Sequence, residues 1–317
     1  MSAAYNMGVD VGSISTKGVI LDEAGEIVAS AYLWTEGDPL GAVARLIQAL
    51  KADLPQNTVV RSVGTTGSAR RLAGAMLGAS AIKNEITAHA VGTLSRHPDT
   101  GTILEIGGQD AKIILLRNQI VIDYAMNTLC AAGTGAFLST QARRLGLSVE
   151  EMGDVALKSD SPAGLSARCT VFAESDLIHK AQAGYSKVDL VAGLCAAVVA
   201  NYLNNVGKGK QIVAPVIFQG GVSKNKGVIA AFERELGCEV SVDKNGHLMG
   251  AVGAALLGAS APKQTSEFSF DMTKRSYKTQ TKPCRGCLNH CEVVYFYRDN
   301  IVLDHWGNRC ENQAALG

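Results

Sequence analysis

Short apolar runs separated by glycine turns dominate the N-terminal third of the chain. From Met7 to Trp34 these runs alternate with turns, which predicts a β-meander that begins on a buried strand. Residues 64–67, Gly-Thr-Thr-Gly, are predicted to form a turn. The periodicity then predicts a helix over 43–54, a strand over 58–63 and helices over 68–77 and 85–94. This order of elements indicates a mixed sheet with attached helices.

The opening pattern of strand, glycine turn, strand, turn and strand recurs from Thr102 to Ala125. Placing Asp10 on Glu105 also places Gly12 on Gly107 and Lys17 on Lys112. Such a correspondence indicates an internal duplication. Two glycine turns are then expected to face one another across a cleft, where their backbone N–H groups would bind phosphate.

The remaining segments continue the alternation of helices and strands. Predicted are a helix capped by Ser186 and Asp189, a buried strand over 213–218, a helix capped by Asn225, a short strand over 239–243 and a helix over 248–257. Residues 261–282 are polar and are interpreted as a linker.

Composition narrows the class of protein. The chain has 317 residues, of which 47% are hydrophobic, enough for two cores. A formal charge of +1 without a long basic run gives no reason to expect nucleic acid or an anionic membrane as a partner. No secretion signal or long apolar run is evident, so a cytoplasmic protein is expected. The eight cysteines are then interpreted as thiols and metal ligands.

Three glycine turns carry the candidate nucleotide chemistry. Glycine lets phosphate approach the backbone, while hydroxyl, ammonium and carboxylate groups bind its oxygens and magnesium. The first turn offers Asp10, Gly12, Ser13, Ser15, Thr16 and Lys17. The second offers Gly107, Gly108, Gln109 and Asp110, and the third Gly220, Gly221, Val222 and Ser223, followed by Asn225. An isolated turn of this kind is often an ordinary hairpin, but three that close strands indicate a nucleotide site.

Two cysteines precede predicted helices. Cys130 is followed by Gly133, Thr134 and Gly135, and Cys169 begins a similar passage. A helix N-terminus suits an anion, either phosphate at the glycines or a thiolate-bound cluster. Two cysteines supply half the ligands of a four-cysteine cluster, so a two-fold dimer would complete the set. The plainer alternative is a pair of buried small residues, the interpretation given to Cys195 and Cys238.

These motifs together resemble the actin, sugar-kinase and Hsp70 ATPase superfamily. The run Cys130-Ala-Ala-Gly-Thr-Gly-x-Phe with Cys169 resembles its branch of 2-hydroxyacyl-CoA dehydratase activators and benzoyl-CoA reductase ATPase subunits, over about residues 5–260. The resemblance implies a duplicated RNase H-like, two-lobed α/β fold. The expected parts are lobes over 5–97 and 98–260, a linker over 261–282 and a cysteine module over 283–317.

The resemblance also implies a mechanism. A homodimer would hold one [4Fe–4S] cluster through Cys130 and Cys169 of each subunit, and ATP hydrolysis would drive an electron into a partner. The expected donor is ferredoxin or flavodoxin, and the acceptor a dehydratase or a double-cubane iron–sulfur protein. Asp10, Lys17 and Asp110 would manage Mg²⁺ and phosphate, and either Gln109 or Asp110 would orient the hydrolytic water. The alternatives are a small-molecule kinase with Asp110 as base, or a non-redox ATP-dependent switch.

Two features depart from that family pattern or stand apart from it. The second turn begins at Glu105, where the superfamily commonly has Asp, which leaves metal placement there less defined. A C-terminal extension carries four cysteines: Cys284, Cys287, Cys291 and Cys310. They favour a structural zinc site that would staple a small module, with a second iron–sulfur cluster and unligated thiols as the alternatives. Glu85 and His89, four residues apart on a predicted helix, could pair or ligate, but a surface ion pair or a capped core histidine is favoured.

Overall fold

Two five-stranded sheets with the same topology form the framework of the chain. Their strand orders are β3-β2-β1-β4-β5 and β8-β7-β6-β9-β10. In each sheet the first three strands are antiparallel and the last two join in parallel. The register is repeated too, because Asp10 lies opposite Lys17 and Glu105 lies opposite Lys112. The predicted duplication is therefore confirmed.

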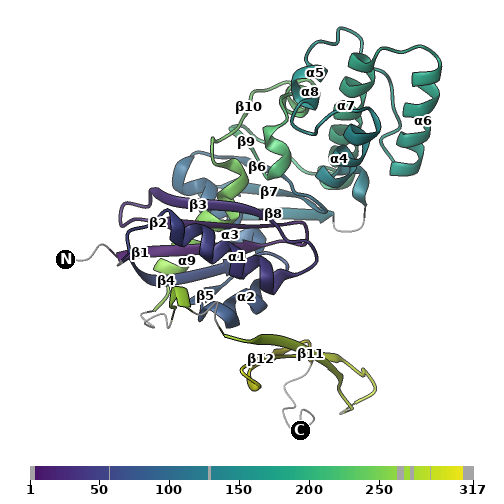
Figure 1. The fold of residues 1–317 in the computed structure, drawn as a ribbon. Coiled ribbons are helices and arrows are strands. Elements are labelled where there is room, and N and C mark those ends of the chain that lie inside the picture. Colours follow the sequence, from purple (N-terminus) through teal and green to yellow (C-terminus); the bar gives the residue numbers. More distant parts are fainter. Residues whose placement is uncertain are drawn as a thin grey trace. The chain divides into compact units, whose positions relative to one another are not determined.

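The computed structural model describes residues 4–56, 58–127, 130–262, 268–271, 275–285 and 287–309. Packing divides the chain into two compact units, residues 1–84 with 254–317, and residues 85–253 (Figure 1). The predicted first lobe ended at residue 97 instead. The packing division precedes α3 (Glu85–Arg96) because the apolar face of this helix, including Ile86 and Ala90, packs on the second sheet.

The first unit holds the first sheet and its helices. Its elements up to residue 84 are β1 (Ala4–Val11), β2 (Ser15–Leu21), β3 (Ile27–Trp34), α1 (Pro39–Ala52), β4 (Val59–Thr66), α2 (Arg70–Leu77) and β5 (Ala81–Ile82). Asp38 caps α1 by accepting from the Gly41 N–H at 2.9 Å, and Pro39 begins the helix. The buried face of α1, which includes Leu46 and Leu50, packs on the sheet.

The second unit carries the second sheet and a group of helices beside it, visible in Figure 1. Besides α3 its elements are β6 (Thr102–Ile106), β7 (Ala111–Arg117), β8 (Ile120–Asn127), η1 (Ala131–Gly133), α4 (Gly135–Arg144), α5 (Met152–Ala156), α6 (Thr170–Gln182), α7 (Lys187–Asn205), β9 (Val216–Gln219), η2 (Gly221–Lys224), α8 (Lys226–Leu236), β10 (Val240–Ser241), η3 (Gly246–Leu248) and α9 (Met249–Ala259). The division between the two units falls within α9. The predicted caps are confirmed, since Ser186 accepts from the Asp189 N–H and Asn225 from the Val228 N–H.

Helix α7 is the central element of the second core. By length and composition it could cross a membrane, but 61% of its most apolar window is buried. Its buried residues include Leu194, Val198 and Tyr202, which pack in the same cluster as Phe232 of α8. The apolar character of α7 is therefore explained by its place in this core.

Two predicted boundaries are wrong. Residues 64–66 form the end of β4 and pair with β1 and β5, so the turn begins only at Gly67. The strand predicted over 213–218 begins only at Val216, because Pro215 has no N–H to donate to a neighbouring strand.

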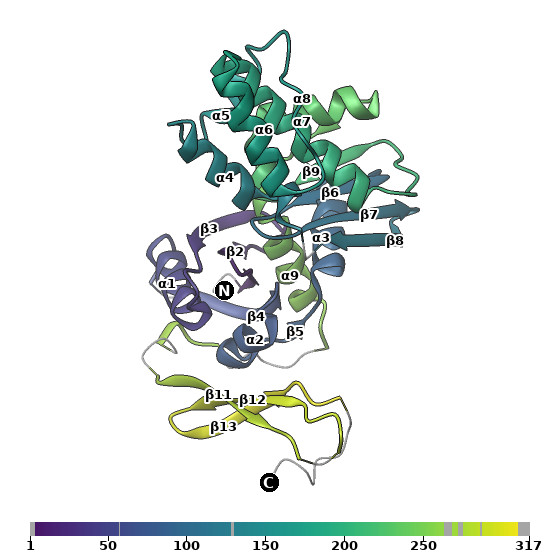
Figure 2. The same ribbon diagram turned by 90° about the vertical axis from the view of Figure 1, so that its right-hand side faces the viewer.

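The C-terminal residues form a third, antiparallel sheet with the order β11-β12-β13 (Figure 2). Its strands are β11 (Tyr277–Pro283), β12 (Glu292–Arg298) and β13 (Ile301–Trp306). Residues 277–282, predicted to be the end of the linker, thus belong to strand β11. Phe296 is fully buried in the core cluster of the first unit, and the Tyr277 hydroxyl donates to the Met76 carbonyl. Since the sheet packs on this core, a metal is not its sole means of stabilisation.

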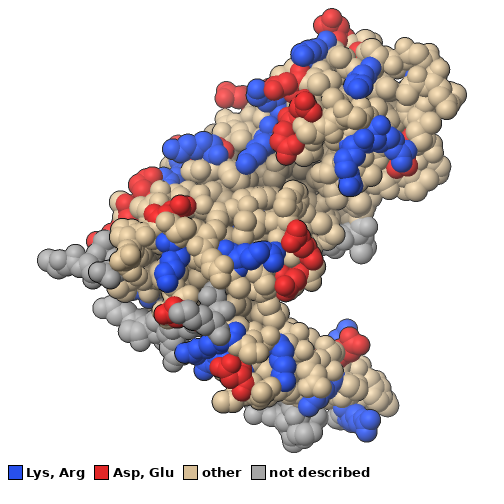
Figure 3. All heavy atoms as spheres, viewed as in Figure 1, with Lys and Arg blue, Asp and Glu red and all other residues tan. Residues whose placement is uncertain are grey.

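Charged side chains are mixed on the surface. On the face shown in Figure 3, Lys and Arg residues are interspersed with Asp and Glu. This distribution matches the formal charge of +1.

Gly64 is required where α9 crosses β4. A Cβ at this position would collide with the Ala254 carbonyl group and lie 3.2 Å from the Gly258 nitrogen. These are backbone atoms, which cannot rotate away. We expect Gly64→Ala to lower the free energy of unfolding by about 3 kcal/mol, the upper end for overpacking. Urea denaturation measures this. Gly164→Ala is the control, because no atom lies within 4 Å of that Cβ position, and an equal loss in both variants would contradict the explanation.

Candidate functional site

The first glycine turn joins β1 to β2 and is closed by backbone and hydroxyl contacts. The Gly12 N–H donates to the Ser15 carbonyl at 3.0 Å, and Thr35 Oγ1 donates to the Gly12 carbonyl at 2.8 Å. Thr16 is fully buried and its hydroxyl lies 2.9 Å from that of Thr35. Of the three predicted hydroxyls, Ser13 is exposed while Ser15 and Thr16 are buried. Thr16 therefore braces the turn, and Ser13 lies at its surface.

Asp10 and Lys17 form an ion pair beside this turn. Lys17 Nζ lies 3.2 Å from Asp10 Oδ2, and the Asp10 side chain is 8% exposed. Gly67 has φ +93°, and a Cβ there would lie 2.7 Å from Asp10 Oδ1. Glycine thus lets the β4–α2 turn approach the carboxylate. A carboxylate suits a divalent cation and an ammonium suits a phosphate oxygen, so this pair matches the needs of a metal-bound phosphate.

The second glycine turn joins β6 to β7 and has the same closing bond. The Gly107 N–H donates to the Asp110 carbonyl at 3.0 Å. The N–H groups of Gly135 and Ala136, in the first turn of α4, donate to the Gly107 and Gly108 carbonyls at 2.9 Å. Gly135 thus uses its N–H to hold the turn. Gln109 is exposed at its tip.

Thr134, which lies between η1 and α4, also makes internal contacts. Its side chain is fully buried, and both its N–H and its hydroxyl donate to the Ala131 carbonyl, at 3.1 and 2.7 Å. The segment 133–135 therefore braces the second turn in the structure, and its predicted contact with phosphate stays a prediction.

Lys112 is the electrostatic centre of the second turn. Its Nζ lies 2.7 Å from Glu85 Oε2, 2.9 Å from Asp110 Oδ2 and 3.0 Å from Glu105 Oε2. Burial by itself lowers the pKa of Lys112, but attraction to Glu105, Glu85 and Asp110 outweighs it and raises the pKa well above its usual value. The ammonium is therefore charged at every physiological pH. It fixes the orientation of Asp110, one of the two carboxylates predicted to manage magnesium.

The sequence prediction did not include Lys112, Glu85 and Glu105 in the site. The internal duplication could have identified Lys112 as a site residue, because it matched Lys112 to Lys17 of the first turn. Glu85 pairs with this lysine across 27 positions, a contact that spacing cannot show. His89 is a buried histidine whose Nδ1 lies 2.9 Å from Gln219 Nε2, which confirms the core interpretation.

The third glycine turn follows β9. Gly220 has φ +90°, its N–H donates to the Gly246 carbonyl at 3.2 Å, and a Cβ there would lie 2.6 Å from Glu105 Oε1. Val222 Cγ2 lies 3.1 Å from the Cβ position of Gly135. The structure thus brings the second turn, the third turn and the start of α4 together. Asn225 instead caps α8, where its Oδ1 accepts from the Val228 N–H at 3.1 Å.

Cys130 and Cys169 both occupy N-cap positions. Each is half-buried, and neither side chain makes a capping hydrogen bond. Cys169 directly precedes α6, as predicted. Cys130 precedes the short helix η1, and α4 begins only at Gly135. Asn127 holds the Cys130 backbone from both sides, because its side chain accepts from the Cys130 N–H and donates to the Cys130 carbonyl, each at 3.0 Å.

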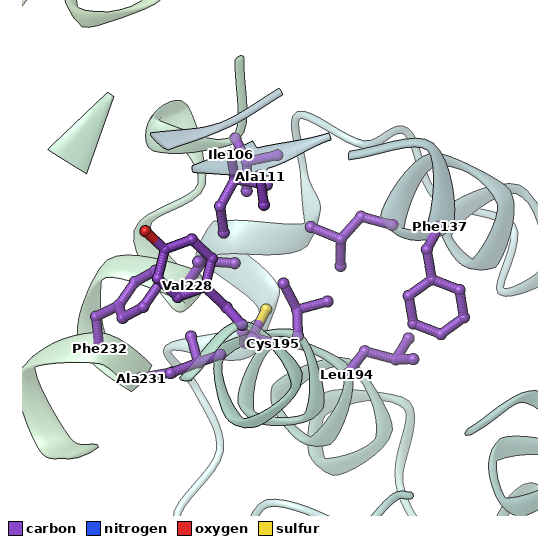
Figure 4. Packing of buried hydrophobic residues seen from close by; sticks show 14 of the residues in the cluster. Ile106, Ala111, Phe137, Leu194, Cys195, Val228, Ala231 and Phe232 are labelled. Atoms are coloured by element: carbon purple, nitrogen blue, oxygen red, sulfur yellow. The ribbon is translucent and has the colours of Figure 1, made fainter. Parts of the chain in front are cut away.

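The remaining cysteines of the second unit are structural. Cys195 is 1% exposed and lies among Leu194, Val228 and Ala231 (Figure 4). Burial raises its pKa to about 12. Cys238 is half-buried and packs against the same cluster. The interpretation of both as small core residues is confirmed.

Three of the four C-terminal cysteines, Cys284, Cys287 and Cys291, lie in the connection between β11 and β12. Cys284 is buried, Cys291 is half-buried and Cys287 is exposed. The Cys284 N–H donates to the Cys291 carbonyl at 2.7 Å. Cys310 lies outside the described residues. Within the part of the chain that the structure describes, no three His, Cys, Asp or Glu residues converge as metal ligands.

A repeated sheet with a glycine turn after its first strand is the architecture of the actin and sugar-kinase fold, and the ion pairs beside both turns suit the phosphates of a nucleotide. Comparison with known proteins agrees. A sugar kinase matches at 15% identity and a TM-score of 0.50, which shows the fold alone. Residues 7–258 match the BadF/BadG/BcrA/BcrD ATPase family. The chain belongs to this family.

Two individual relatives match this chain at higher sequence identity than the sugar kinase does. The 2-hydroxyisocaproyl-CoA dehydratase activator of Clostridioides difficile is 35% identical over 86% of this chain and 98% of its own length. The (R)-2-hydroxyglutaryl-CoA dehydratase activating ATPase of Acidaminococcus fermentans is 34% identical over 80% of this chain and 96% of its own. The solved structure of the activator from Clostridium difficile with bound ADPNP matches with a TM-score of 0.72 at 34% identity, covering 85% of this chain and 96% of that one. The family match ends at residue 258, so β11–β13 and their cysteines lie outside it.

Proposed function

We propose that this chain is an ATP-dependent activator that transfers an electron to an iron–sulfur partner enzyme. One observation carries the proposal: two half-buried cysteines occupy helix N-caps in the unit whose glycine turn is bonded directly to α4. A plain phosphotransferase needs no such pair of thiols. The family relationship supports the ATPase part of the proposal.

Nucleotide chemistry would use the charged pairs at the two turns. Asp10 and Asp110 are the proposed carboxylates for Mg²⁺, and Lys17 the proposed phosphate ligand. Lys112 keeps Asp110 in place through the 2.9 Å ion pair. Gln109, exposed at the tip of its turn, is the proposed residue that orients the hydrolytic water. The structure with bound ADPNP shows that a relative of this chain takes an adenine nucleotide analogue.

Cys130 and Cys169 are the proposed ligands of a [4Fe–4S] cluster shared by two subunits. Their thiols fit such a group because both are partly exposed and neither is engaged in a helix cap. Two thiolates from each of two chains complete the four ligands. When bound, the cluster would supply a low-potential electron. The positive end of α6 beside Cys169 would stabilise the negative charge of the reduced form.

A direct contact couples the proposed nucleotide turn to the proposed cluster ligands. Gly107 and Gly108 accept hydrogen bonds from the first turn of α4, which follows Cys130 by a few residues. Movement of the turn on nucleotide hydrolysis would therefore displace α4 and the Cys130 loop with it. In this way ATP turnover would change the surroundings of the cluster.

Partners follow from the relatives. The two relatives from Clostridioides difficile and Acidaminococcus fermentans are, by name, activators of 2-hydroxyacyl-CoA dehydratases. We propose a dehydratase of this class, or a double-cubane iron–sulfur protein, as electron acceptor. The proposed donor is ferredoxin or flavodoxin.

Anaerobic purification tests the proposal. The protein should be brown and dimeric, hold about four irons per dimer, and hydrolyse ATP. Size-exclusion chromatography, iron analysis and phosphate release measure the three properties. A colourless protein that hydrolyses ATP but takes up no iron on anaerobic reconstitution would contradict the electron-transfer role.

The C-terminal cysteines form a second proposed metal site. Cys284, Cys287, Cys291 and Cys310 would hold a structural zinc ion, with a second iron–sulfur cluster as the alternative. Removing the whole extension is a poor test, because Phe296 is part of the first unit's core. Cys287→Ser is better, since this side chain is exposed. Metal analysis should find about one zinc per chain in the native protein and much less in the variant, whereas equal zinc in both would contradict the site.

A further inference from the structure

Asn201, on α7, is a fully buried polar side chain that contacts two separate loops. Its Oδ1 lies 2.7 Å from the position that a Cβ of Gly133 would take, so glycine is needed there. Its Nδ2 donates to the Ala167 carbonyl at 2.5 Å. Asn205, one turn further along α7, donates to Asn201 Oδ1 at 3.0 Å and fixes the amide orientation.

These two loops are the ones that carry the cysteines. Gly133 follows Cys130 by three residues, and Ala167 precedes Cys169 by two. The two cysteines are 39 positions apart in the chain, yet one side chain bridges the backbone beside both. Helix α7 supports this side chain from the core, since the helix is buried over much of its length.

We propose that Asn201 is a positioning residue that holds the two cysteine loops as one rigid body. The inference rests on the proposed cluster site for its function, but the bridging contact itself does not. Thiolates that bind one cluster must stay at a fixed separation, and outer groups that orient ligands are commonly needed for this. Asn201 adds a buried polar link to the direct contact that α6 makes with η1.

The same contact completes a route from the nucleotide turn to Cys169. The turn at Gly107 is bonded to Gly135, and η1 lies between Gly135 and Cys130. Asn201 touches the end of η1 at Gly133 and reaches Ala167 on the other loop. Displacement of the turn would therefore move both proposed ligands together. A contiguous packed route of this kind is a physical means of coupling two sites.

Thiol alkylation of the iron-free full chain tests the bridge without any cluster. Iodoacetamide labelling at pH 8, followed by peptide mass mapping, gives a rate for each cysteine. In Asn201→Ala, alkylation of Cys130 and Cys169 should both rise at least fivefold. In Asn201→Asp, which keeps an oxygen towards Gly133 but cannot donate to Ala167, the rise should be larger at Cys169. Gly133→Ala, which pushes on Asn201 from the other side, should also raise both rates.

Three controls distinguish the loss of the Asn201 bridge from a general loosening of the fold. Asn204→Ala, an exposed asparagine on the same helix, should leave every rate within twofold of the native chain. Exposed Cys287 should react alike in all variants, and buried Cys195 should stay protected. Unchanged rates at Cys130 and Cys169 in Asn201→Ala would overturn the inference, as would a rise at Cys195 equal to theirs. A native protein without iron would instead defeat the proposed function and leave the alkylation result standing.

Discussion

Lys112→Met should lower the free energy of unfolding by about 3–5 kcal/mol, the cost of breaking a buried ion pair by removing one partner. The native lysine is 1% exposed and neutralises part of the charge of Glu85, Glu105 and Asp110. Methionine has a similar volume, so the loss is electrostatic and not a cavity effect. Chemical denaturation of the anaerobically prepared chain at pH 8 measures it.

The pH dependence of this loss follows from the same geometry. The pKa of native Lys112 is raised, so its stabilisation is present in full below the unfolded value of about 10.4 and persists above it. The native chain therefore gains no pH dependence from Lys112 between pH 5 and 8. In the variant, the carboxylates that lose this ammonium can take up protons as the pH falls. The penalty should thus be smaller at pH 5 than at pH 8.

The duplication provides the matched control. Lys17 occupies the equivalent position in the first sheet, where its Nζ pairs with Asp10 and lies 5.9 Å from the centre of the Tyr32 ring, and its side chain is 16% exposed. Lys17→Met should cost only about 1 kcal/mol, because solvent screens what remains. Adding Glu105→Gln to Lys112→Met should recover part of the loss, since one unpaired charge is removed. Equal losses for the two lysine variants would contradict the assignment of Lys112 as an electrostatic centre.

Local periodicity was sufficient to predict much of the fold. The β-meander and the helix caps at Ser186 and Asn225 depend on residues close together in sequence, and the repeat of Asp10 at Glu105 is a match between two such local patterns. The repeat was the strongest signal, because matched residues in two segments imply matched topology. The two sheets confirm it.

Contacts between distant residues could not be predicted this way. Gly64 was placed in a turn because glycine and threonine favour turns, whereas its real role is to admit the backbone of α9 beside β4. Strand β11 was taken for linker because its exposed residues are polar and only Tyr277 is partly buried towards the core. Both errors concern positions whose explanation lies almost two hundred residues away in the chain.

Part of the candidate site could likewise be predicted from local sequence patterns, and part could not. Glycine turns and N-cap cysteines are local patterns, and the structure places Cys169 directly before a helix as expected. The partners that hold these residues are remote. Glu85 reaches Lys112 and Asn201 reaches Ala167 only after the helices pack, so neither role was visible in the sequence.

Cys130→Ser and Cys169→Ser should each abolish stable iron binding in the anaerobically reconstituted dimer. In a cluster shared across a two-fold axis, one substitution removes two of the four ligands, because both subunits carry it. We expect the iron content to fall from about four per dimer to near zero, with the brown absorbance lost in parallel. ATP hydrolysis should persist, because the charged pairs Asp10–Lys17 and Asp110–Lys112 remain intact.

Cys195→Ser and Cys238→Ser are the matched controls from the same unit, since their thiols pack in or against the hydrophobic core. These variants should keep the full iron content. Because Cys130 and Cys169 are half-buried and serine is close in size, neither substitution should unfold the chain, and circular dichroism checks this. If the iron content instead stays complete when Cys130 and Cys169 are both replaced by serine, and is lost in Cys287→Ser, the metal belongs to the C-terminal sheet. The helix N-caps of the second unit would then have no part in electron transfer.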